Sequence, residues 1–175
     1  MTIEEAIANN IGSVITGSVA ILTSCITAGV AVWVSSINHN RAVAEAKRKE
    51  NIERLENLYI SFESWSSALL KIYVKVSYQF KGIVTTDDTN KSIDNMKEKP
   101  ADYIALINAT INLHHRSLLP SFEKVTTQQR NLGQFLLGER KASLLNKFIA
   151  EQEKFEGICN EFKNSIVLEM NKLTK

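Results

Sequence analysis

Residues Ile11 to Ile37 read IGSVITGSVAILTSCITAGVAVWVSSI, a run without a single charged side chain. About 20 predominantly apolar residues are enough for a helix to cross the hydrocarbon core of a bilayer, so this run can span one with some tilt. The alternative is a buried core helix, but such helices rarely run this far without a charge. The run therefore predicts one transmembrane helix over 11–37, preceded by a short extracytoplasmic tail over 1–10.

Charges on the two sides of this run predict its orientation. No Lys or Arg precedes it, which also argues against a cleaved signal peptide, because such peptides begin with a positive region. A basic cluster follows it, made of Arg41, Lys47, Arg48, Lys49 and Arg54. Positive residues close to the end of a span favour the cytoplasmic side. We therefore expect the tail outside and the C-terminal domain inside a cell membrane, which in a bacterium would be the inner membrane.

Small residues of the run recur at steps of three and four, which places them on one face of a helix. This face consists of Ser13, Gly17, Ala20, Ser24, Ala28, Ala31 and Ser35. In lipid, close backbone approach through small residues is a main route to helix association, so we expect it to be a packing face. Two alternatives stay open: Ser and Thr bond only to their own backbone and the helix stays alone, or the face lines a water-filled pore.

The residues after the run predict a long helix. Residues 38–51 combine alanines with charges and are typical of a charged, solvated helical neck, and no Pro or Gly interrupts the chain from Val30 to Lys81. From Ile52 to Phe80 apolar residues repeat at alternating steps of three and four. Their aromatic content favours a helical bundle over a strict two-stranded coiled coil. Gly82 would end this helix, the following TTDDTNKS predicts a turn, and Ser92 to Lys99 predict a short solvated helix.

Two further helical segments complete the predicted bundle over 52–175. Pro100 suits the first turn of a helix, and Pro120 would kink or restart it. A final helix starting near Glu139 would bury a stripe made of Leu145, Phe148, Gln152, Phe155, Cys159, Phe162, Ile166 and Leu173. The predicted fold class is therefore all-α: one N-terminal transmembrane helix that continues into a cytoplasmic antiparallel helical bundle. The bundle would hold three long helices, with the middle one broken at Pro120.

Residues able to carry chemistry form no catalytic, metal-binding or nucleotide-binding pattern. His114 and His115 are adjacent, so they point to different faces of a helix and cannot form the i, i+4 pair of a metal helix. Since His114 is in line with Ile111, we expect it to be half-buried and structural. Cys25 and Cys159 are expected to be free thiols that act as small apolar residues. We predict no catalytic residue, no metal site, no cofactor and no enzymatic activity.

Together these patterns predict a membrane-anchored helical interaction protein that binds a protein partner at the cytoplasmic face, able to form a homo-oligomer through its transmembrane helix. The alternative is a membrane effector, of the toxin or abortive-infection type, whose oligomerised transmembrane helices perturb or permeabilise the bilayer. The expected partners are the lipid bilayer, a protein and other copies of the chain. Nucleic acid is not expected, because the net charge of the whole chain, +2, is too small to suggest nucleic-acid binding.

Overall fold

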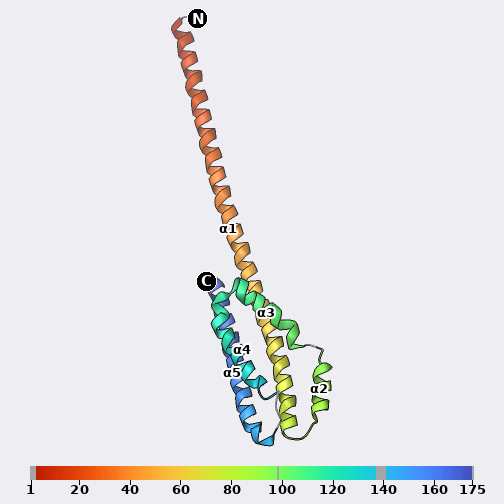
Figure 1. Ribbon diagram of the computed structural model, residues 1–175. Coiled ribbons are helices and arrows are strands. Elements are labelled where there is room, and N and C mark those ends of the chain that lie inside the picture. The colour runs from red at the N-terminus through yellow and green to blue at the C-terminus, as the bar shows by residue number, and fades with distance from the viewer. Residues whose placement is uncertain (1–2, 98, 137–140, 175) are drawn as a thin grey trace. The chain divides into compact units, whose positions relative to one another are not determined.

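The computed structural model of the protein describes residues 3–97, 99–136 and 141–174, and within these it leaves the side chains of residues 4–23 and of Cys25 undescribed. The described residues form helices joined by turns and contain no strand (Figure 1). The predicted all-α class is confirmed. The chain divides into two compact units, Met1–Arg48 and Lys49–Lys175, which are treated separately below.

The α-helices in chain order are α1 (Ile3–Phe80), α2 (Thr86–Asp94), α3 (Pro100–His114), α4 (Leu119–Gly133) and α5 (Leu145–Thr174). Two single-turn 3-10 helices precede the last two of them, η1 (Arg116–Leu118) before α4 and η2 (Ala142–Leu144) before α5. The final helix was predicted to start near Glu139. That residue lies outside the described part, and the described helix begins at Leu145 because Ala142 to Leu144 wind as a 3-10 turn.

The predicted end of α1 is confirmed. The backbone of Gly82 has φ 70°, a left-handed conformation that costs glycine little and other residues more. The Gly82 amide donates to the Gln79 carbonyl at 3.0 Å, and the Ile83 amide donates to the Tyr78 carbonyl at 3.0 Å. These two bonds form the Schellman arrangement, which satisfies carbonyl groups that the end of a helix leaves without partners.

The core of the second unit is built from aromatic rings on α1, α4 and α5. Phe62 of α1 lies 4.6 Å from Phe162 of α5, and Phe80 of α1 lies 5.2 Å from Phe148 of α5, measured between ring centroids. Because the lower-numbered ring of α1 meets the higher-numbered ring of α5, these helices run antiparallel. Most positions of the predicted stripes are fully buried, among them Leu55, Phe62, Trp65, Tyr73, Val76, Phe155, Cys159 and Ile166.

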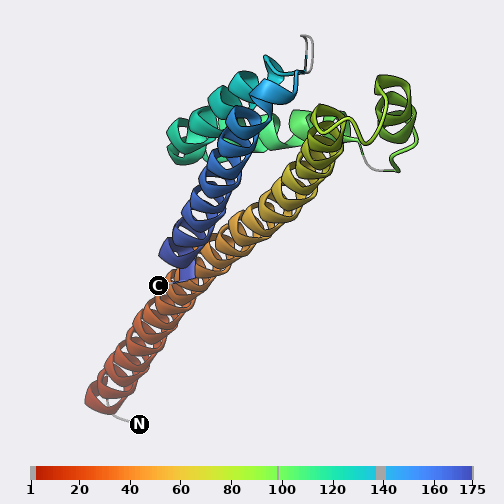
Figure 2. The same ribbon diagram turned by 90° about the horizontal axis from the view of Figure 1, so that it is seen from below.

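The prediction of three long helices with a broken middle one is wrong, because the chain reverses direction between α3 and α4. At one end of the unit His114 contacts Arg54 of α1. From there α4 runs back along α5, with Phe122 5.4 Å from Phe162 and Phe135, just past its end, 5.6 Å from Phe148. Figures 1 and 2 both show α4 beside α5 and α3 diverging from α4. The bundle is therefore formed by α1, α3, α4 and α5.

The prediction for residues 85–99 is also wrong. Instead of a turn followed by a helix over Ser92 to Lys99, the chain forms α2 at Thr86–Asp94. The Thr85 hydroxyl oxygen accepts a hydrogen bond from the Asp88 amide at 3.1 Å, and the Asp88 carboxylate accepts one from the Thr85 amide at 3.3 Å. This reciprocal capping box starts a helix within a segment of turn-like composition. Asp88 thus forms the N3 half of the capping box of α2.

We expect the bundle to fold without the first unit, since its aromatic core lies within Lys49–Lys175. A fragment covering Arg41 to Lys175 should be soluble, mostly helical by circular dichroism, and cooperative in urea unfolding. A matched fragment that ends at Gly133 should be largely unfolded, because it lacks the three phenylalanines of α5 that contact the core rings of α1. Disorder in the longer fragment would show that the core needs the membrane or a partner.

Candidate functional site

The described part of the first unit exposes large apolar side chains along α1. Within the predicted span they are Ile26, Val30, Val32, Trp33 and Val34, with exposed fractions of 70% at Val32 and 65% at Trp33. Neighbouring positions point in different directions around a helix, so the apolar surface extends around much of the helix. Leaving apolar surface in water costs about 25 cal/mol per Å², and large exposed apolar surfaces mark sites that contact lipid or protein.

The predicted packing face is described over its second half. Ser24, Ala28, Ala31 and Ser35 lie on α1 and are exposed. A β-carbon added at Gly29 would meet no atom within 4 Å, so the backbone there is open to close approach. The side chains of Ser13, Gly17 and Ala20 lie outside the described residues. This half of the face therefore has the accessibility that helix packing requires.

Across the described residues, none of the helices combines the length and the apolar character needed to cross a bilayer. Of the predicted span over 11–37, the side chains of 11–23 and of Cys25 are outside the description.

The structure divides the predicted basic cluster. Arg41, Lys47, Arg48 and Lys49 are exposed, whereas Arg54 is engaged within the bundle. One guanidinium nitrogen of Arg54 is 2.5 Å from a carboxylate oxygen of Glu50, and the other is 3.0 Å from the His114 ring. Four of the five cations are thus available to face lipid headgroups or solvent, and Arg54 has a structural role that its sequence context did not show.

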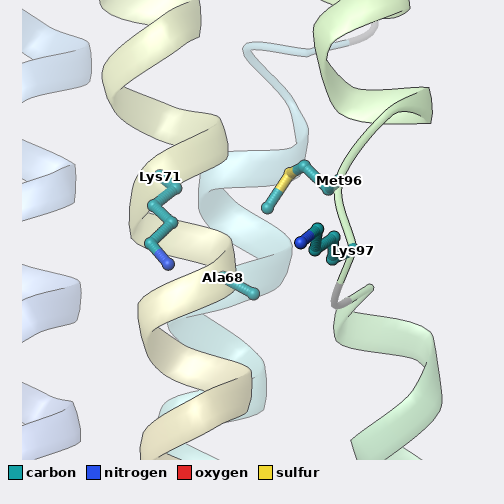
Figure 3. A pocket seen from close by; sticks show the side chains of 4 residues that line it. All are labelled: Ala68, Lys71, Met96 and Lys97. Atoms are coloured by element: carbon teal, nitrogen blue, oxygen red, sulfur yellow. The ribbon is translucent and has the colours of Figure 1, made fainter.

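A surface hollow of about 320 Å³ lies in the second unit between α1 and the segment after α2. Figure 3 shows Met96 extending towards α1 next to Lys97, with Ala68 and Lys71 on the opposite side. Both lysines are exposed, and among the described residues the hollow is lined by these two lysines together with Ala68 and Met96. Within the described residues no group of three or more His, Cys, Asp or Glu side chains could hold a metal ion.

Polar side chains between the bundle helices serve packing. The Lys163 ammonium lies 2.8 Å from the Glu63 carboxylate and joins α5 to α1, and this hydrogen bond raises the pKa of Lys163. The Gln128 side-chain amide donates to the Glu151 carbonyl at 3.0 Å and joins α4 to α5. Burial raises the pKa of the Cys159 thiol to about 12, so the thiol stays protonated and unreactive at neutral pH.

The prediction that His114 is half-buried is wrong. His114 is exposed, whereas its neighbour His115 is buried with 6% of its surface exposed. The reason is that α3 ends at His114, and the His115 backbone, at φ −132° and ψ 55°, leaves the helical path and turns its ring inward. Helical periodicity predicts the orientation of side chains only within a helix, and His115 lies beyond the end of α3. The feature of the sequence that indicated an early end of α3 was Pro120, a few residues further on.

Comparison of the chain with protein-family models, curated proteins and solved structures finds no match.

Proposed function

We propose that this protein is a membrane-anchored helical interaction protein, in which α1 inserts into a bilayer and the bundle binds a protein partner at the cytoplasmic face. The observation that carries the proposal is the uncharged run over 11–37, whose described part exposes the large apolar side chains of Val30, Val32 and Trp33. Lipid is the environment that accepts a helix exposing apolar side chains of this size without charges.

Several features support a role in binding. The bundle exposes large apolar side chains on α3, where Leu106 and Leu113 lie seven residues apart and so on the same face. Polar contacts between its helices, such as the ion pair of Lys163 with Glu63, hold the helices together. A surface of this kind suits contact with another protein better than transformation of a small molecule.

The membrane-effector function is the second candidate. Its support is the exposed row of small residues at Ser24, Ala28, Ala31 and Ser35, which would allow several helices to approach closely. In that case the assembled helices would themselves perturb the bilayer.

The proposal predicts the topology of the chain. A reporter that is active only outside the cytoplasm should work when fused before Met1 and fail when fused after Lys175, because the cations after the span favour the cytoplasm. Neutralising Arg41, Lys47, Arg48 and Lys49 while adding three lysines before Ile11 should invert this pattern. Neutralising Arg54 alone should leave the pattern unchanged, because that guanidinium is engaged by Glu50 and His114. An external signal from the reporter after Lys175 in the unaltered chain would overturn the orientation.

A further inference from the structure

The reversal between α3 and α4 is held by a short joint, residues 115–118. The His115 amide donates to the Ile111 carbonyl at 3.1 Å and closes the last turn of α3. The Leu118 amide donates to the His115 carbonyl at 2.9 Å and opens η1. His115 is therefore the residue at which the backbone leaves one helix and enters the next, and its side chain and that of Leu118 are buried.

Two polar contacts fasten this joint to the neighbouring helices. Next to it, the His114 ring meets Arg54 of α1 at 3.0 Å. The Ser117 hydroxyl donates to the Glu169 carboxylate of α5 at 3.0 Å, and the same carboxylate pairs with Lys172 at 2.7 Å. Both contacts lie at exposed positions, where such bonds contribute little to stability. Holding the joint closed therefore depends largely on the buried side chains.

The surroundings of the His115 ring in the folded structure disfavour its protonated, charged form. Its Nε2 atom is buried and has no hydrogen-bond partner among the described residues, so a proton added there would create a charged donor without an acceptor. Of the charged groups around the ring, the Glu169 carboxylate attracts a proton, whereas His114 and Arg54 repel it. Glu169 is already engaged by Ser117 and Lys172.

We propose that residues 115–118 form an acid-sensitive joint, in which protonation of His115 opens the turn between α3 and α4. The orphaned ring nitrogen and the non-helical backbone at His115 carry this inference, and it holds whether or not the chain spans a membrane. Opening would free Arg54 and the neighbouring stretch of α1, so the joint offers a way for acidification to change the surface that the bundle presents.

The pH window follows from the direction of the pKa shift. Burial, as the largest cause, lowers the pKa of His115 below its ordinary value of about 6.5. Above that value both the open and the closed joint are neutral, so pH has no effect. As pH falls below it, the open joint takes up a proton and the closed joint does not, so opening becomes up to about tenfold more favourable per pH unit. Glu169 stays ionised in this window, because its hydrogen bond with Lys172 lowers its pKa.

Hydrogen exchange of the full chain in lipid nanodiscs tests the joint. After correction for the chemical exchange rate, the amides of residues 115–119 should exchange several-fold faster at pH 5.5 than at pH 7.5, and by at most about tenfold. The central amides of α5 around Phe155 should stay equally protected at both pH values. His115→Gln and His115→Phe should each remove the acceleration, because neither side chain takes up a proton.

The neighbouring histidine supplies the matched control. His114→Gln loses the contact with Arg54 but keeps His115, so its joint should still respond to acid. Retention of the full response in both His115 variants would refute the proposal, as would a wild-type chain whose joint exchanges equally at both pH values. If the His115→Phe chain fails to fold, the His115→Gln chain and the wild-type comparison still decide.

Discussion

Phe62→Ala should lower the free energy of unfolding of the bundle by about 3–5 kcal/mol. The Phe62 side chain is 0% exposed and lies where three helices meet. Its ring centroid is 4.6 Å from Phe162, 5.5 Å from Trp65 and 6.4 Å from Phe122. Removing the ring leaves a cavity that the surrounding helices can fill only in part, so lost burial and lost contacts add up.

Urea unfolding of the Arg41–Lys175 fragment measures this effect directly. The sequence holds two tryptophans, Trp33 and Trp65, so in this fragment Trp65 alone reports on the core around Phe62. Phe155→Ala should destabilise the fragment by a similar amount, since that ring is 6.2 Å from Trp65 and 0% exposed. Leu168→Ala on the same helix is the control: its side chain is 63% exposed, and the expected change is below about 0.5 kcal/mol. Equal effects of Phe62→Ala and Leu168→Ala would mean that the packing described here is wrong.

Replacing residues 11–37 with an unrelated single-pass helix of the same orientation should leave the protein in the membrane with its bundle intact. If the protein is a membrane-anchored interaction protein (the anchor function), the transmembrane helix only holds the bundle at the bilayer. Any helix that crosses in the same direction should then suffice. Expression of the native chain should also leave cells polarised, as measured with a voltage-sensitive dye. The physical reason is that the run contains no ionisable residue, and such residues are the usual mark of an ion pathway in a membrane.

The effector function predicts the opposite results. Native expression would depolarise cells, the replacement would abolish that effect, and a change such as Thr27→Val would alter it, because polar groups that line a pore control ion passage. Either function allows the small residues to pack. Ser24→Leu and Ala28→Leu should therefore weaken self-association in detergent, since bulky side chains hold backbones apart, and Val32→Leu should not. Depolarisation that disappears with Thr27→Val would show that the protein acts as a membrane effector and is more than a membrane anchor for the bundle.

Helices and their buried faces followed from local patterns in the sequence. The steps of three and four from Leu55 to Phe80 and from Phe148 to Ile166 identify the buried stripes, because a helix presents these positions on one side wherever it packs. Gly82 ends α1 for an equally local reason, a backbone conformation that favours glycine. The charge-free run over 11–37 and the basic residues after it are also visible without any structure, and the membrane proposal depends on them.

The path of the chain between helices could not be read in this way. A stripe of buried positions looks the same whether the next helix continues straight on or turns back, so the reversal at residues 115–118 left no periodic signal. Contacts between residues far apart in sequence decide it: α4 packs Phe122 against Phe162, and His114 meets Arg54. The same contacts bury His115, expose His114 and separate Arg54 from the four exposed cations. Local sequence determines which side of each helix avoids water, whereas the direction of a chain after a helix ends depends on the surfaces already in place to receive it.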